Sequence, residues 1–238
     1  MNQDTVRPCA EAGCVPPADW SLVLPLKPLA IAKSRLGPYA GGLRGELALA
    51  FALDTAAAAL RCPAVARLLV VTDDPQAGAA LRAAGALVVP DEPALGLNPA
   101  LRHGMARARV LAPAAPVAAL SADLPALRAA ELARVLARVP VGGRAFLADA
   151  PGTGTTLLAA APGVAPAPAF GGGSRRRHLA SGAREITLPD VPSVRRDVDT
   201  GEDLAQALAL GVGPRTAAVA GALRPSGRGG RPVGRPLP

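Results

Sequence analysis

Short apolar runs alternate with longer segments of helical composition from residue 20 to residue 210. The runs are continuously apolar, which is typical of strands in a sheet that is covered on both faces. The segments between them are rich in alanine, the residue with the highest helix propensity. We therefore predict strands at 21–26, 67–72, 86–89, 117–121, 144–148, 155–160 and 185–188. We predict helices at 43–60, 76–84, 99–111, 126–139, 175–181 and 202–210.

This alternation of strand and helix predicts an α/β fold with a mostly parallel, Rossmann-like sheet and helices on both faces. The chain has 238 residues, half of them apolar, which suffices for the core of one such domain. Residues 1–19 and 224–238 lack the periodicity. We expect them to be a disordered leader and a disordered Arg/Pro/Gly-rich tail around a single domain at 20–223.

The net charge of +8 is unevenly distributed, because four arginines after residue 223 supply half of it. The remaining body is moderately basic, which suits an anionic small molecule. Aromatic residues make up only 2% of the chain and do not interleave with the basic residues as they do in proteins that stack on bases. We therefore expect no nucleic-acid partner.

The three cysteines, Cys9, Cys14 and Cys62, form no CxxC pair and no cluster with histidine, so no zinc site is expected. The sequence has no charge-free apolar run of 18 residues and no basic-then-apolar leader. We expect a reduced, cytoplasmic protein with no membrane partner.

A basic loop follows the first predicted strand and carries Lys27, Lys33, Ser34 and Arg35. In a parallel sheet the ligand lies beyond the carboxyl ends of the strands, so polar residues at these positions are candidates for binding. Such a loop can wrap a triphosphate, although it lacks the spacing of a Walker A motif. On charge alone, a solvated basic loop is an equally good interpretation.

Carboxylates follow other predicted strands. Asp73 and Asp74 come after the second strand, and Asp123 comes directly after the strand at 117–121. A carboxylate at a strand tip can hold a Mg²⁺ ion that bridges phosphate oxygens, or it can cap the next helix. In the Asp197-Val-Asp199 segment, alternation places both carboxylates on one face, where they could complete a metal site. Alternatively, Asp199 or the residue after it caps the helix near residue 202.

A glycine-rich turn at 170–174 (FGGGS) leads into a basic helix start at 175–178 (RRRH). Free backbone N–H groups at such a turn favour an anion, and threonines at 153, 155 and 156 add hydroxyl groups. We predict a pocket for a phosphorylated acid, while an ordinary loop with a basic helix start remains the alternative.

The only histidines are His103 and His178, and neither stands with Ser or Cys in a triad-like pattern. Nucleotidyl transfer requires positioning and charge neutralisation and needs no protein nucleophile. This residue inventory therefore favours nucleotidyl transfer over a nucleophilic hydrolase.

Seven stretches occur in the order seen in one family: LPLKPLAIAKSRL, VVTDD, GLNPALRHG, SADLPAL, GTGTTLL, FGGGSRRRH and RRDVDTGEDL. In these the chain resembles the guanylyltransferases of coenzyme F-420 biosynthesis, which are related to MobA-like and sugar-nucleotide transferases. The resemblance runs from residue 20 to about residue 223 and leaves out the two ends.

The resemblance implies a GT-A-like Rossmann sheet and transfer of GMP from GTP to phosphoenolpyruvate, with release of pyrophosphate. The product would be enolpyruvyl-diphospho-5'-guanosine, which a downstream transferase of coenzyme F-420 assembly would use. The composition suggests a GC-rich, actinobacterial source, and the resemblance implies phosphoenolpyruvate as the acceptor, because family members of such sources are associated with it and archaeal members with phospholactate. The alternatives are 2-phospho-L-lactate, 3-phosphoglycerate, or a different nucleotide or acceptor.

The same resemblance implies roles for individual residues. Asp123 would hold Mg²⁺ together with Asp199 or Asp197. The catalytic residues would be Lys33 and Asp123. The nucleotide-binding residues would be Lys27, Lys33, Ser34, Arg35, Asn98 and Pro99, and the acceptor-binding residues would be Thr156, Gly171 and Ser174.

Overall fold

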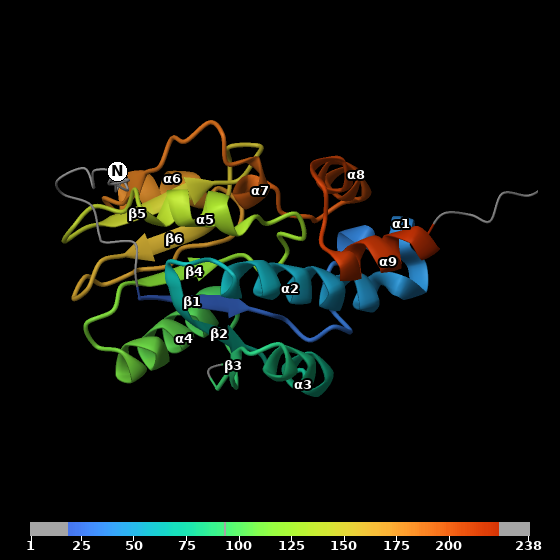
Figure 1. Cartoon of the computed structure of the whole chain (residues 1–238), viewed down its shortest axis with the longest axis horizontal. Coiled ribbons are helices and arrows are strands. Elements are labelled where there is room, and N and C mark those ends of the chain that lie inside the picture. Colours follow the sequence, from blue (N-terminus) through green and yellow to red (C-terminus); the bar gives the residue numbers. More distant parts are fainter. Residues whose placement is uncertain (1–18, 93, 224–238) are drawn as a thin grey trace, which may run out of the picture.

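The computed structural model describes residues 19–92 and 94–223, and these form one seven-stranded sheet with helices on both faces (Figure 1). The strand order is β3-β2-β1-β4-β6-β5-β7, and every strand except β6 runs in the same direction. The strands are β1 (Trp20–Pro25), β2 (Val65–Val71), β3 (Leu87–Val89), β4 (Val117–Leu120), β5 (Arg144–Ala148), β6 (Thr155–Ala160) and β7 (Arg184–Glu185). The predicted mostly parallel α/β sheet is confirmed. The expected leader and tail, 1–19 and 224–238, lie outside the described residues apart from Asp19.

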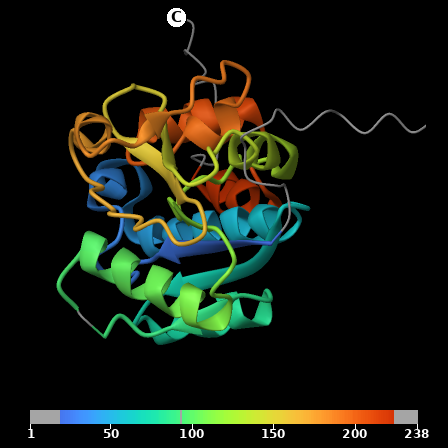
Figure 2. The same ribbon diagram turned by 90° about the vertical axis from the view of Figure 1, so that its left-hand side faces the viewer.

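The helices pack on the sheet through two separate apolar clusters. One cluster joins Leu22 and Leu24 of β1 to α2, α3, α5 and α7, while Val23 points to the opposite face, where α4 packs. Figure 2 shows α4 (green) and α2 (cyan) on opposite sides of β1 (blue). The α-helices of the described residues are α1 (Gly37–Ala40), α2 (Arg44–Leu60), α3 (Pro75–Ala83), α4 (Leu97–Leu111), α5 (Ala129–Leu136), α6 (Ser174–Ala180), α7 (Pro192–Arg195), α8 (Gly201–Leu210) and α9 (Pro214–Ala222). None of the described helices is both long and apolar enough to cross a membrane.

A third apolar cluster lies beyond the carboxyl ends of the strands. It brings together Leu36, Phe51, Ala126, Val198 and Leu204, which come from five distant parts of the chain. The cluster holds α1, α8 and α9 against α2. It includes Leu36, which directly follows Arg35 of the basic loop, and Val198, which lies between Asp197 and Asp199. Burial of these apolar side chains therefore positions the polar residues beside them.

Most predicted elements are present with boundaries within two residues of those predicted, but the helix predicted at 126–139 covers only Ala129–Leu136. Two of the intervening N–H groups bond to distant side chains: the Leu124 N–H donates to Thr55, and the Arg128 N–H donates to Ser193. These tertiary hydrogen bonds replace the first helical turn that the sequence pattern predicts.

The prediction of a strand at 185–188 is wrong in its length, since β7 covers only Arg184–Glu185. The guanidinium of Arg195 donates to the carbonyl oxygens of Ile186 and Leu188, each at 3.2 Å, so these groups are bonded outside the sheet. The short helices α1 and α7 and the last described helix, α9, were not predicted. Helix α9 is held by α2, where the buried Asp54 carboxylate accepts the Thr216 N–H at 2.7 Å.

Candidate active site

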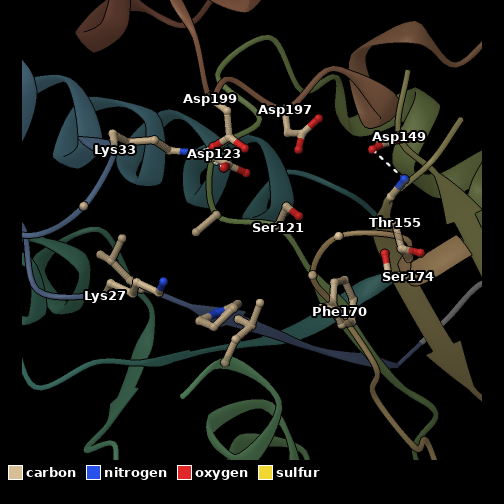
Figure 3. Close-up of a pocket in the computed structure, with 18 of the residues that line it drawn as sticks. Lys27, Lys33, Ser121, Asp123, Asp149, Thr155, Phe170, Ser174, Asp197 and Asp199 are labelled. Carbon is tan, nitrogen blue, oxygen red and sulfur yellow. Dashed lines mark hydrogen bonds and ion pairs between the residues drawn. The ribbon is translucent and has the colours of Figure 1, made fainter. Parts of the chain in front are cut away.

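A cavity of about 590 Å³ opens at the carboxyl ends of the parallel strands (Figure 3). Its walls come from the loop after β1, the tips of β4 and β5, the start of β6, the starts of α4 and α6, and the 197–199 segment. The polar side chains in its lining are Lys27, Lys33, Ser34, Arg35, Ser121, Asp123, Asp149, Thr153, Thr155, Ser174, Asp197 and Asp199.

The structure brings Asp123, Asp197 and Asp199 together around Lys33, and we call these three aspartates the acidic cluster. The Lys33 ammonium donates to Asp123 Oδ2 and, at 2.7 Å, to Asp199 Oδ1. The Val198 N–H donates to the Asp123 carbonyl at 3.1 Å, which draws the two segments together. Because Val198 is buried in the third apolar cluster, alternation turns its two acidic neighbours toward the cavity, as predicted.

Neither helix-capping alternative applies to the acidic cluster. Helix α5 starts six residues after Asp123, and its N-cap residue is Arg128. Helix α8 is capped by Thr200, whose hydroxyl accepts the Asp203 N–H while the Asp203 carboxylate accepts the Thr200 N–H. Thr200 thus performs the capping role that the sequence left open, and the Asp199 carboxylate is available for the cavity.

The charges of the cluster shift one another's protonation. Burial alone would lower the pKa of Lys33, but the carboxylates of Asp123 and Asp199 raise it above its ordinary value. Burial acts to raise the pKa of Asp199, yet attraction to Lys33 leaves it below its ordinary value. Burial, followed by repulsion from Asp123 and Asp199, raises the pKa of Asp197 to about 7. Lys33 is therefore a permanent cation, and Asp197 takes up a proton more easily than Asp199.

Hydrogen bonds from other parts of the chain hold residues 29–32 of the basic loop, just before Lys33, in place. The Asp74 carboxylate caps α3 by accepting the Ala77 N–H and also accepts the Leu29 N–H at 2.8 Å. The Arg44 guanidinium donates to the carbonyl oxygens of Ala30 and Ala32, each at 2.6 Å. Lys33 itself has left-handed backbone angles, φ 53° and ψ 42°, which cost on the order of 1 kcal/mol for a residue with a side chain.

Lys27 and Lys33 are the only lysines in the chain, against 24 arginines, and both line the cavity. Lysine offers a compact, strongly hydrated point charge, whereas arginine offers a planar fork. Lys27 lies across the cavity from the acidic cluster, as Figure 3 shows. Its neighbours in the lining include Ser34 and Arg35, and the Arg35 side chain is largely exposed. A chain that otherwise uses arginine thus keeps lysine at the two places where a compact cation faces the cavity.

The end of the cavity away from the acidic cluster is formed by the glycine turn, Gly171–Gly173, and by Ser174 at the first position of α6. Gly171 and Gly173 have φ of 111° and 70°, which a side chain would strain. The Ser174 hydroxyl is buried and has no hydrogen-bond partner among the described residues, and the same is true of the Thr156 hydroxyl. Unpaired buried hydroxyl groups are costly, and a ligand oxygen at the glycine turn would satisfy that of Ser174, which lines the cavity.

His178 joins the elements around the glycine turn. Its Nε2 accepts the Ala169 N–H at 3.0 Å, so in the neutral ring the proton lies on Nδ1, which faces the Thr155 hydroxyl at 2.9 Å. Burial, aided by the positive charges of Arg177 and Arg144, lowers the pKa of His178 to about 4. The imidazole is therefore neutral at physiological pH and holds α6, β6 and the segment at residue 169 together.

Several residues predicted for binding lie outside the cavity lining. The Asn98 side chain donates to the Phe170 carbonyl at 3.1 Å and accepts the Phe170 N–H at 2.7 Å, so it positions the segment before the glycine turn. Pro99 follows it inside α4. Thr156 is fully buried behind Thr155, because an irregularity in the β5–β6 register presents Thr155 to the cavity.

None of the three arginines at 175–177 lines the cavity. Arg175 forms a bidentate ion pair with Glu185, and Arg177 donates to the carbonyl oxygens of Ala169, Phe170 and Gly172. Arg177 therefore supports the glycine turn from outside the cavity, while Arg175 joins α6 to β7.

Sequence reasoning missed Asp149, which lines the cavity at the tip of β5. Its carboxylate accepts the N–H groups of Thr153 and Gly154, at 2.8 and 2.7 Å, and so closes the turn into β6. The signal was available, because Asp149 directly follows a predicted strand, as Asp123 does. Asp73 and Asp74 satisfy the same rule but lie outside the cavity lining, and Asp73 accepts the Asp91 N–H.

Residues 43–188 match the family model of the MobA-like NTP transferase domain. The chain belongs to the MobA-like NTP transferase family. It is 65% identical to the phosphoenolpyruvate guanylyltransferase of Streptomyces coelicolor over 210 residues, which are 88% of this chain and 99% of that protein. It is 64% identical to the phosphoenolpyruvate guanylyltransferase of Thermomonospora curvata over 201 residues, which are 84% of this chain and 88% of that protein.

A solved nucleotide-diphospho-sugar transferase from Desulfovibrio desulfuricans has a similar fold, with a TM-score of 0.62 and 18% identity, over 79% of this chain and 85% of that one. This likeness agrees with the GT-A-like, nucleotide-diphosphate transferase type of sheet that the resemblance implies.

Proposed function

We propose that this protein is a phosphoenolpyruvate guanylyltransferase. The phosphate of phosphoenolpyruvate attacks the α-phosphorus of GTP, the bond from that phosphorus to the bridging oxygen breaks, and pyrophosphate leaves. The product is enolpyruvyl-diphospho-5'-guanosine. The identity of 64–65% to two proteins of this name over most of the chain supports the reaction. The observation that carries it in the structure is the meeting of Lys33 with Asp123 and Asp199 at one end of a cavity whose other end is the glycine turn.

The acidic cluster fits a hard divalent cation. One oxygen of Asp123, Oδ1, is buried without a hydrogen-bond partner among the described residues, and carboxylate oxygens are ligands that Mg²⁺ prefers. Within residues 19–92 and 94–223, no group of three acidic, histidine or cysteine side chains forms a ready-made ligand set. Mg²⁺ itself commonly takes one or two carboxylates and fills its remaining positions with water and phosphate oxygens. Asp123 with Asp199 or Asp197 would hold such an ion, which would neutralise charge on the triphosphate.

The cationic side chains of the cavity supply the remaining neutralisation. Lys27, Lys33, Ser34 and Arg35 face the same space and can donate to phosphate oxygens of GTP. As charge builds on the departing pyrophosphate, these donors stabilise it. Since Asn98 is occupied with Phe170, its effect on the nucleotide would be exerted through the position of that segment.

The phosphorylated acid fits the glycine turn. Ser174 carries a buried unpaired hydroxyl group in the cavity lining, and Gly171 allows a close approach to the backbone. The predicted role of Thr156 would be indirect, since it lies behind Thr155. An acceptor held there lies across the cavity from the acidic cluster, so its phosphate can reach a nucleotide bound between the two ends.

The test is pyrophosphate release with Mg²⁺, GTP and phosphoenolpyruvate. We expect Asp123→Asn to lower kcat by at least about a hundredfold, since it removes a carboxylate that would hold the cation neutralising the leaving polyphosphate. Asp73→Asn is the matched control, because Asp73 also follows a strand but lies outside the cavity, and it should leave kcat within about twofold. Chelation of divalent cations should abolish the release.

The acceptor and the nucleotide are tested side by side. Phosphoenolpyruvate should give the largest kcat/KM when compared with 2-phospho-L-lactate and 3-phosphoglycerate, and GTP should be preferred over CTP and ATP. Absence of pyrophosphate with all three acids would refute the proposal. A better rate with another acid or nucleotide would keep the nucleotidyl transfer and reassign the substrate.

Both substrates are cytoplasmic metabolites, so we place the reaction in the cytoplasm. A downstream transferase of coenzyme F-420 assembly, as the consumer of the product, stays a prediction that pull-down of the full chain with such an enzyme can test.

A further inference from the structure

Lys33 occupies the position between two carboxylates where a bridging cation would bind. Its ammonium contacts Asp123 Oδ2 and Asp199 Oδ1, and its side chain is only 12% exposed. The third aspartate of the cluster, Asp197, lies beside them in the cavity wall. Three carboxylates in one place repel each other, and the lysine offsets this repulsion.

An ammonium and a divalent cation compete for these carboxylates. The ammonium nitrogen lies 2.7 Å from Asp199 Oδ1, whereas Mg²⁺ binds carboxylate oxygens at about 2.0–2.1 Å and in a strict octahedral arrangement. An ion bridging Asp123 and Asp199 would therefore lie within a few ångströms of the lysine nitrogen, where two like charges repel strongly.

The backbone at Lys33 also favours movement of its side chain away from Asp123 and Asp199. It stands at the start of the 3-10 helix Ser34–Leu36, with left-handed backbone angles that are unfavourable for a residue with a side chain. The stretch before it is anchored by Asp74 and Arg44, and Leu36 after it is buried, so movement is confined to a few residues.

We infer that Lys33 is an internal counter-ion of the acidic cluster, which a divalent cation must displace before the lysine can bind the triphosphate. This inference rests on the proposed function, and it adds an order of events. Lys33 neutralises Asp123 and Asp199 first, exchanges with the divalent cation, and then turns its ammonium to the nucleotide. The protein thus carries a built-in competitor that weakens cation binding and exposes the phosphate-binding lysine only when the cation is in place.

The small number of lysines makes the exchange directly measurable. A short pulse of an amine-acylating reagent, followed by mass spectrometry, reports Lys27 and Lys33 separately in the unaltered full chain. With a chelator and no nucleotide, we expect Lys33 to react at least tenfold more slowly than the exposed Lys27. At saturating Mn²⁺, we expect the Lys33 rate to rise at least fivefold while the Lys27 rate changes less than twofold. An unchanged Lys33 rate at a Mn²⁺ concentration that calorimetry shows to be saturating would overturn the inference.

A variant gives an independent measurement. By calorimetry without nucleotide, Lys33→Met should bind Mn²⁺ at least tenfold more tightly than the unaltered protein, since the internal competitor is gone. Lys27→Met removes the same charge from the same cavity without contacting the acidic cluster, and its Kd for Mn²⁺ should stay within threefold. Equal or weaker Mn²⁺ binding by Lys33→Met would contradict the inference.

The outcomes separate this inference from the proposed function. If the unaltered protein releases pyrophosphate and binds Mn²⁺ while the acylation rate of Lys33 does not rise, only the proposed exchange of Lys33 with the cation is wrong. If neither the unaltered protein nor Lys33→Met binds Mn²⁺, the exchange and the metal site both fail. The labelling experiment uses the unaltered protein, so it decides the matter even if the variant does not fold.

Discussion

The hydroxyl of Ser174 is buried at the first position of α6 and has no partner among the described residues. Removing it costs the folded protein no hydrogen bond, while an acceptor bound at the glycine turn would lose one to a charged group. We therefore expect Ser174→Ala to raise the KM for phosphoenolpyruvate about tenfold, with the KM for GTP and the melting temperature nearly unchanged.

Steady-state kinetics with each substrate varied in turn measure this effect. Ser181→Ala is the control on the same helix region, since the Ser181 hydroxyl donates to the His178 carbonyl away from the cavity. It should leave both KM values unchanged. An equal rise in both KM values for Ser174→Ala would argue against a site specific for the acid.

At the scale of elements, α4 lies close to the sheet because Gly104 lacks a side chain. A Cβ atom there would lie 2.5 Å from Val71 Cγ2 and 2.6 Å from Val23 Cγ1, both in the core. Gly104→Ala should therefore lower the free energy of unfolding by about 1–3 kcal/mol, as expected for overpacking. Urea unfolding measures the change.

The control for this substitution is Gly221→Ala, near the end of α9, where a Cβ would meet nothing within 4 Å. Here alanine gains helix propensity and should be neutral or stabilising by up to about 1 kcal/mol. A stable Gly104→Ala protein would show that α4 can move away from β1 and β2 at little cost.

Helix α6 is tied to the sheet by a neutral histidine, which makes its attachment sensitive to acid. Because the folded pKa of His178 is about 4, well below its ordinary 6.5, the unfolded chain binds a proton between these values that the folded chain does not. The contribution of His178 to stability is complete above pH 6.5 and falls as the pH drops to 4, by up to about 3 kcal/mol.

The measurement is the difference in the free energy of unfolding between the unaltered protein and His178→Gln at pH 7, 6 and 5. The difference is needed because Asp197, whose pKa is raised to about 7, acts in the opposite direction as the pH falls from about 7 toward its ordinary value. Parallel pH profiles for the two proteins would contradict the role assigned to His178.

At the scale of the whole molecule, the three apolar clusters that the described residues form extend from Trp20 to Leu223. The Streptomyces coelicolor relative is matched over 99% of its length by 88% of this chain. We therefore propose that residues 20–223 are the nucleotidyltransferase domain. A chain shortened to these residues should keep its melting temperature within about 2 °C and its kcat within about twofold. Loss of activity on removal of either end would assign that end a role.

The sequence located much of the site because parallel strands direct their carboxyl ends to one edge, so residues after each strand converge. This rule found Asp123 and the basic loop, and applied without exception it would also have found Asp149. It could not separate these from Asp73 and Asp74, since only the structure shows that those two bond to backbone N–H groups outside the cavity. Nor could it choose Thr155 over Thr156, because a strand irregularity decides which side chain faces the cavity.

Hydrophobic periodicity by itself determined the class of fold, because the burial of strands and helices depends on local patterns that are written along the chain. The order of the strands, the late start of α5 and the packing of α9 on α2 were decided only in the tertiary structure, through contacts between residues far apart in sequence. The same holds for the pairing of Lys33 with Asp123 and Asp199, which are separated by 90 and 166 positions. Electrostatic interaction depends on distance and burial in space, and neither quantity exists before the chain has folded.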